Sequence, residues 1–231
     1  MREILTSGLP ALGVEAACIP NLEKFSKLLL EKNQVMNLTA ITEPDQVATL
    51  HLLDSLALLT VADFQGKQVV DVGTGAGFPG MPLAIASPGT AFTLLDSLGK
   101  RVRFLEEARD ALGLSNVACV HGRAEEFARD HREGFDLAVS RAVANLSVLC
   151  ELCLPLVKVG GAFLAMKSTG CEAETDAARE AIRRLGGRLG RTADYTIPTT
   201  EIPHRVLVIE KIAPTPHKYP RPFAQIKKQP L

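Results

Sequence analysis

The chain has 231 residues, of which 26 are basic and 26 acidic, so its bulk charge does not favour binding to nucleic acid. Its length predicts one domain with an appendage, and a hydrophobic fraction of 46% is enough for a packed core. The longest N-terminal apolar stretch, residues 9–14, is too short to span a membrane and follows no basic leader. With an odd number of cysteines, five, these features predict a cytoplasmic protein.

Residues 1–66 predict a helical cap in front of the main fold. Residues 1–20 show no clear period. A helix is expected over about 21–36, where apolar residues recur on one side, and a second over about 42–59. Two helices at this place are well positioned to cover a site at the edge of a sheet.

The second cap helix carries two polar residues of interest, His51 and Asp54, at a spacing of three. This spacing can place both on one helix face. They could contribute to the site, or they could make a structural hydrogen bond under the cap.

Residues 67–80 are the stretch around which the chain is organised. Residues 68–72 predict a short buried strand rich in valine. The glycines that follow, at 73, 75 and 77, predict a tight turn in which the missing side chains let a ligand contact the backbone. Strand, glycine turn and helix form the first crossover of a nucleotide-binding α/β sheet, with the ligand at the carboxyl ends of the strands.

The glycine turn leaves two classes of ligand to compare. Residues 75–80 match the G-x-G-x-x-G pattern of dinucleotide sites, and Asp96 could hold a ribose in either class. Asp71 favours a cationic ligand over a dinucleotide, because a carboxylate two residues before the first glycine repels a pyrophosphate and attracts a cation. S-adenosylmethionine has an ammonium, a sulfonium and no phosphate, so the stretch predicts a methyl-donor site.

From residue 67 onward, strand and helix patterns alternate, which predicts a parallel sheet with right-handed crossovers. The expected strands are 68–72, 91–95, 116–120, 135–139 and 161–166, and the expected helices are about 79–86, 99–112, 122–130, 145–156 and 172–185. Two further strands, 189–196 and 204–211, have no helix between them and predict an antiparallel pair. The predicted fold is therefore a Rossmann-like α/β core over 67–213, mostly parallel with an antiparallel terminal strand.

Polar residues follow the predicted strands at the edge where a ligand binds. Asp96 can accept both ribose hydroxyls of an adenosine, or it can cap the next helix. The Ala124 amide and the Glu125 carboxylate can contact an adenine edge, although Glu125 could simply stabilise its helix N-terminus. Arg141 and Lys167 can bind the donor's carboxylate or the substrate, or can be solvated charges.

Cys150 and Cys153 form a C-x-x-C pair inside a predicted helix. The sequence offers no second pair to complete a zinc site, so we expect two small residues facing the core and no metal.

The C-terminal residues carry a charge pattern of their own. Residues 211–231 hold five basic residues and no acidic one, whereas residues 1–210 hold 21 basic and 26 acidic residues. The segment 214–231 is predicted to be a basic tail, which is either a nucleic-acid arm or merely solvated.

These motifs together resemble the RsmG, or GidB, family of ribosomal RNA small-subunit methyltransferases, and the resemblance covers roughly residues 21–231. It rests on the following sequences: Asp-Val-Gly-Thr-Gly-Ala-Gly-Phe-Pro-Gly (71–80), Leu-Leu-Asp-Ser-Leu-Gly-Lys-Arg (94–101), Arg-Ala-Glu-Glu (123–126), Ser-Arg-Ala (140–142), Met-Asn-Leu-Thr (36–39), His-Leu-Leu-Asp-Ser (51–55) and the basic terminus. Ala76, Phe78 and the first twenty residues depart from the family pattern.

The resemblance implies a class I Rossmann-like methyltransferase that transfers a methyl group from S-adenosylmethionine to guanine N7 at position 527 of 16S ribosomal RNA. It implies as partner the 16S rRNA or the small ribosomal subunit, or an assembly intermediate of it. No membrane partner is expected, and the enzyme is expected to be a monomer. Carried over by motif, the donor contacts are Gly73, Phe78, Ala124, Glu125 and Arg141.

The residues themselves extend this site. They add Asp71, Gly75, Gly77 and Asp96 to the contacts with the methyl donor. They also indicate Arg141, Asn145 and Lys167, which follow the fourth and fifth predicted strands of the parallel sheet, as the catalytic residues that donate hydrogen bonds to the substrate and position it. Two other functions compete: an NAD-dependent oxidoreductase, which NADH titration would detect, and a non-catalytic module that binds the methyl donor or RNA, which single-turnover methyl transfer would exclude.

Overall fold

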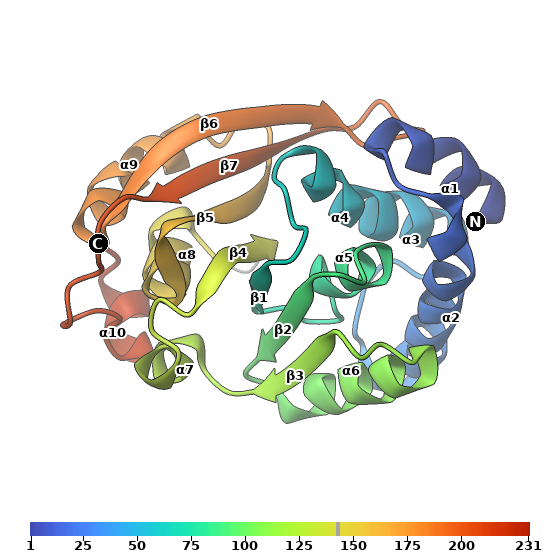
Figure 1. The fold of residues 1–231 in the computed structure, drawn as a ribbon, viewed down its shortest axis with the longest axis horizontal. Coiled ribbons are helices and arrows are strands. Elements are labelled where there is room, and N and C mark those ends of the chain that lie inside the picture. The colour runs from blue at the N-terminus through green and yellow to red at the C-terminus, as the bar shows by residue number, and fades with distance from the viewer. Residues whose placement is uncertain (142–143) are drawn as a thin grey trace.

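The computed structural model describes residues 1–141 and 144–231. These residues form a seven-stranded sheet of order β3-β2-β1-β4-β5-β7-β6 (Figure 1). Strands β1 to β5 are parallel, and β7 runs antiparallel to both β5 and β6. The strand bounds are β1 Gln68–Val72, β2 Ala91–Asp96, β3 Val117–His121, β4 Phe135–Arg141, β5 Val157–Ser168, β6 Gly187–Thr196 and β7 Pro203–Lys211. The predicted fold class is confirmed.

Helices connect the parallel strands and extend to both ends of the chain. Their bounds are α1 Arg2–Gly8, α2 Ile19–Met36, α3 Pro44–Val47, α4 Asp54–Leu56, α5 Gly80–Ala86, α6 Gly99–Leu112, α7 Ala124–Asp130, α8 Leu146–Cys153, α9 Glu172–Arg184 and α10 Phe223–Lys228. From β1 to β7 the predicted elements match these within a few residues. Among the described residues, no helix has both the length and the apolar character needed to cross a membrane.

The alternation of side chains along each strand builds two hydrophobic cores, one on each face of the sheet. In β1, Val69 packs on the face covered by α2, α5 and α6. Val70 and Val72 pack on the opposite face, against α7, α8 and α9. Cys150 and Cys153 of α8 are fully buried in this second core, as the sequence predicts for small core residues.

The N-terminal cap differs from the prediction in two ways. Residues 1–20, for which the sequence shows no period, contain α1 and two 3₁₀ turns, and their Leu5 and Leu9 are buried against the cap. The second cap helix runs without a break over residues 44–60, close to the prediction, but it is not α-helical throughout: α3 continues into a π-helical stretch, Ala48–Leu53, then into α4 and a 3₁₀ turn. Periodicity misses both features because packing holds short, irregular turns that have little helical preference of their own.

The C-terminal segment is folded onto the body of the protein (Figure 1). Lys211 is completely buried, and its ammonium donates to Glu133 Oε1 (3.0 Å) and to the carbonyls of Leu154 and Val157. Arg221 makes a two-pronged ion pair with the buried Glu151 of α8, at 2.8 and 2.6 Å. Of the five basic residues in 211–231, Lys211 is therefore buried and Arg221 is partly buried in an ion pair, whereas Lys218, Lys227 and Lys228 are exposed.

Candidate active site

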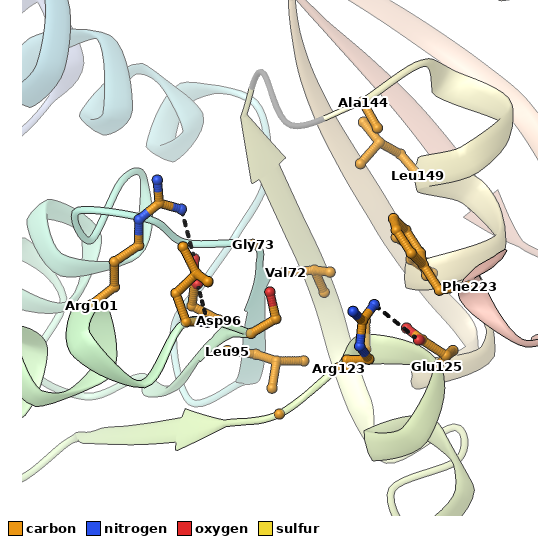
Figure 2. A pocket seen from close by; sticks show the side chains of 15 residues that line it. Val72, Gly73, Leu95, Asp96, Arg101, Arg123, Glu125, Ala144, Leu149 and Phe223 are labelled. Atoms are coloured by element: carbon orange, nitrogen blue, oxygen red, sulfur yellow. Dashed lines mark hydrogen bonds and ion pairs between the residues drawn. The ribbon is translucent and has the colours of Figure 1, made fainter. Parts of the chain in front are cut away.

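A cavity of about 320 Å³ opens at the carboxyl ends of β1, β2 and β3, beside the point where the strand order reverses between β1 and β4. Ligands of open α/β sheets bind at this position. Four predicted donor contacts line it: Gly73, Asp96, Ala124 and Glu125. Figure 2 shows the side chains around it, which come from the ends of the strands, from α6, α7 and α8, and from α10. We call it the first cavity.

Asp96, the last residue of β2, is held rigidly at the rim of the first cavity. Its side chain is only 4% exposed, and its oxygens accept hydrogen bonds from the amides of Gly75 (2.9 Å) and Leu98 (2.8 Å). The Arg101 guanidinium lies 3.5 Å away (Figure 2). A carboxylate has about four lone-pair positions, so these contacts leave capacity for the hydroxyls of a ribose.

The start of α7 supplies the other acidic group of the first cavity. Glu125 is 7% exposed, and one of its oxygens lies 3.7 Å from the Arg123 guanidinium (Figure 2). Ala124 is the first residue of the helix, a position at which the amide has no partner inside the helix. An amide donor and a carboxylate acceptor are thus adjacent, which is the pair that an adenine edge requires.

The glycine turn between β1 and α5 is fastened by Asp71. Its Oδ2 accepts from the Thr74 hydroxyl (2.7 Å) and the Gly80 amide (2.8 Å), and Oδ1 is buried without a hydrogen-bond partner among the described residues. Burial raises the pKa of Asp71 to about 7. A β-carbon at Gly80 would lie 2.8 Å from Asp71 Oδ2, so only glycine permits this approach.

Several predicted donor contacts do not line the first cavity. Gly75 and Gly77 have positive φ angles and shape the turn, and Asp71 lies beneath it. Phe78 is 5% exposed, and its ring stacks on His51, with 4.5 Å between the ring centroids. Contact between these residues and a donor remains a prediction.

Arg141, at the end of β4, belongs to another cavity of about 500 Å³ beneath the cap. This second cavity lies between the π-helical stretch, α4, the ends of β4 and β5, α9 and β7. Two of the predicted catalytic residues, Arg141 and Lys167, line it together with His51 and Asp54, and the sequence reasoning did not identify its other polar groups, Ser168, Glu174 and His204.

Asp54 is the centre of a buried polar network at the second cavity. It is 1% exposed; Oδ2 accepts from Arg141 (3.1 Å), while Oδ1 accepts from the Tyr195 hydroxyl (2.7 Å) and contacts His204 Nδ1 (2.7 Å). Burial alone would raise the pKa of Asp54, but the contacts with His204, Arg141 and Tyr195 hold it below its usual value. The carboxylate therefore stays ionised and positions Arg141.

His51 does touch this network, but through Arg141 rather than through Asp54. Its Nδ1 lies 3.2 Å from the Arg141 guanidinium, and its Nε2 lies 2.8 Å from the Thr39 hydroxyl. Burial and the charge of Arg141 lower the pKa of His51 to about 4. The imidazole is therefore neutral near pH 7.

The remaining predicted catalytic residues have structural contacts of their own. The Lys167 ammonium donates to Glu174 (2.7 Å) and to the Ala144 carbonyl (3.1 Å). Asn145 caps α8 by accepting from the Ser147 amide (2.9 Å), and it does not line either cavity. Ala142, which belongs to the predicted Ser-Arg-Ala motif, lies outside the described residues.

Sequence reasoning did not identify Tyr195, His204, Glu174 or Phe223. His204 and Glu174 line the second cavity from β7 and α9, and Tyr195 of β6 donates to Asp54 beside it. No motif or spacing in the sequence connects these three residues with the cap. Phe223 lines the first cavity from α10, in the segment that the sequence predicts to be a tail. Its signal was weak: one aromatic residue among prolines and lysines.

The strand order, the antiparallel β7 and the glycine turn after β1 define the class I methyltransferase fold. A crystal structure titled as a SAM-dependent methyltransferase from Aquifex aeolicus is similar, with a TM-score of 0.54 at 17% identity over 72% of this chain and 93% of that one.

Sequence comparison identifies the family. The GidB family model, described as rRNA small subunit methyltransferase G, matches residues 18–197. Relatives with the name ribosomal RNA small subunit methyltransferase G include one from Alkaliphilus oremlandii, 47% identical over all of this chain and 99% of its own length, and one from Alkaliphilus metalliredigens, 46% identical over 100% and 98%. The chain belongs to the GidB family of rRNA small subunit methyltransferases.

Proposed function

We propose that the protein transfers the methyl group of S-adenosylmethionine to N7 of guanosine 527 in 16S ribosomal RNA, in the cytoplasm. Membership of the family supports this function. The observation that carries it is the first cavity, where Gly73, Asp96 and the Ala124–Glu125 pair face the same space. These groups follow β1, β2 and β3, and they suit a methionine backbone, a ribose and an adenine in that order along the sheet edge.

The second cavity is a suitable place for the target base. It is lined by Arg141, from the end of β4, and by Lys167, from β5, whose charged groups can donate to the guanine O6. The Asp54 network fixes the Arg141 guanidinium before substrate arrives, which supports a positioning role for this residue. A guanine that enters a cavity must leave its stack, so the enzyme acts on a loop or a flipped nucleotide.

The chemistry needs alignment rather than proton transfer. The N7 lone pair forms a bond to the methyl carbon while the carbon–sulfur bond breaks and its electrons go to sulfur, so the positive charge moves to the purine and no proton leaves the ring. Placing the reacting atoms in line and in near contact can account for most of the reduction in the activation barrier. His51, with a pKa of about 4, is already deprotonated at neutral pH, so its charge does not change there.

The test is to map labelled methyl groups on 16S rRNA after single turnover with the purified protein. Free rRNA, assembly intermediates and whole small subunits that lack the modification should be compared as substrates. The expected result is one methyl group, at N7 of guanosine 527, with a rate that is nearly flat between about pH 6 and pH 8.5. Because His51 has a pKa of about 4, a flat profile alone does not exclude it as a base, so the single-turnover rate of His51→Gln is compared with that of the wild type at pH 7. Methylation at another atom, or a His51→Gln rate that is about a hundredfold lower or more, would contradict the proposal.

A further inference from the structure

The first cavity has one wall that does not belong to the sheet or its crossovers. This wall is Phe223, the first residue of α10, which lines the cavity opposite the strand ends (Figure 2). Apolar side chains of α8, Leu149 and Leu152, line the cavity on the same side. The ring is partly exposed.

The segment that carries Phe223 is held in place by contacts outside the cavity. Arg221 binds the fully buried Glu151 through its backbone amide (2.9 Å) and its guanidinium. Arg132 donates to the carbonyls of Pro216 (3.0 Å) and Tyr219 (2.9 Å). Ile226, nearly one helical turn further along α10, is 0% exposed. The position of Phe223 therefore does not depend on a ligand.

The surroundings of the ring show which part of a donor it faces. The Arg123 guanidinium lies 5.2 Å from the centroid of Phe223 and pairs with Glu125, so the ring is next to the start of α7. This is the end of the cavity that holds the adenine-edge groups, whereas Gly73 and the glycine turn lie at the end of β1. An apolar wall at this end fits a flat aromatic base better than a charged methionine.

We propose that Phe223 covers the adenine ring of the methyl donor, so that α10 is the outer wall of the nucleoside subsite. This inference rests on the proposed use of S-adenosylmethionine. The C-terminal segment is then part of the donor site, in addition to any role of its exposed lysines toward RNA. Aromatic rings in contact attract each other beyond the area that they bury, so losing this wall should weaken binding of the nucleoside about tenfold.

The test compares Phe223→Ala with Phe223→Leu and with Gln225→Ala, a change at an exposed position of the same helix. Binding of S-adenosylhomocysteine and of adenosine to the full-length proteins is measured by calorimetry, and thermal unfolding is followed in parallel. Phe223→Ala should raise both dissociation constants by about the same factor, near tenfold. Phe223→Leu should give a smaller rise and Gln225→Ala none, with all variants folded.

The outcomes separate the inference from the proposed function. Unchanged affinities in Phe223→Ala would overturn the inference, and so would a loss confined to S-adenosylhomocysteine, because the ring would then contact the amino-acid end. If Phe223→Ala unfolds, an equal affinity of Phe223→Leu and the wild type for adenosine would likewise overturn it. Failure of the wild-type protein itself to bind S-adenosylhomocysteine would instead contradict the proposed function.

Discussion

The two cavities at the carboxyl edge of the sheet are built in different ways. The first is lined mainly by residues between 72 and 125, which lie at the ends of three consecutive strands or within the first turn of the helix that follows. The second collects residues between 50 and 204, from the cap, two strands, a helix and the antiparallel pair. Local sequence can specify the first, whereas the second exists only when distant elements pack together.

The difference extends to the polar groups. Asp96 in the first cavity is held by backbone amides within about two dozen residues of it. Asp54 in the second is held by side chains 87, 141 and 150 positions away along the chain. We therefore expect changes in the second cavity to affect stability first, and changes in the first cavity to affect ligand binding first.

The largest expected effect is that of Asp54→Ala. Removing this carboxylate leaves the Arg141 guanidinium buried without its partner and the Tyr195 hydroxyl without an acceptor. Breaking a buried pair on one side costs roughly 3–5 kcal/mol, so the free energy of unfolding in urea should fall by about this amount.

The matched control is Asp176→Ala, which removes an exposed Asp–Arg pair with Arg179. Exposed pairs contribute roughly 0–1 kcal/mol, so this variant should be close to the wild type. Equal decreases in stability of the two variants would show that the network at Asp54 is no more than a surface contact.

His51 should make the second cavity sensitive to acid. Its folded pKa of about 4 lies below the unfolded value near 6.5, so the unfolded state binds more protons between these values and the wild type loses stability as pH falls. The stability of the wild type relative to His51→Gln should therefore fall by about 3 kcal/mol from pH 6.5 to pH 4.

The comparison with His51→Gln is needed because Asp71 acts in the opposite direction. Its pKa is raised to about 7, so its contribution is present at low pH and is lost as pH rises from about 4 to 7. Since Asp71 is unchanged in both proteins, its contribution cancels in the difference between urea denaturation curves. A pH-independent difference would mean that His51 titrates normally in the folded protein.

In the first cavity, Asp96→Ala should weaken binding of S-adenosylmethionine by about tenfold or more, because hydrogen bonds to a charged group contribute roughly 1.5–3 kcal/mol. Calorimetry measures the affinity. Asp110→Ala, at an exposed position on α6, is the control. Unchanged donor affinity would exclude Asp96 from the ribose site. The Asp96 carboxylate would then have a structural role only, like that of Asp54 in the second cavity.

The smallest effect is expected outside both cavities, at Lys227 and Lys228. Neutralising these exposed residues should weaken RNA binding and flatten its salt dependence, by roughly 0.7–0.9 in log–log slope for each phosphate that is no longer neutralised. Donor affinity and stability should not change. Lys27→Gln, at an exposed position on α2, is the charge control, and an unaltered salt slope in the double variant would leave the C-terminal lysines merely solvated.

The sequence by itself determined the strands and helices from β1 to β7, the antiparallel ending and the four residues that line the first cavity as predicted. It could do so because each depends on neighbours along the chain: a valine-rich strand, glycines where φ is positive, a carboxylate at a strand end. The family resemblance rested on the same local motifs, and the family comparison confirmed it.

Only the tertiary structure decided the rest. Three features depend on contacts between segments far apart in sequence: the π-helical turn that carries His51, the ion pairs of Lys211 and Arg221, and the meeting of Asp54 with Tyr195 and His204. The sequence alone does not distinguish a solvated charged residue from one that is buried beside a partner. Its burial is decided by the free energy of packing the whole fold, which no local pattern records.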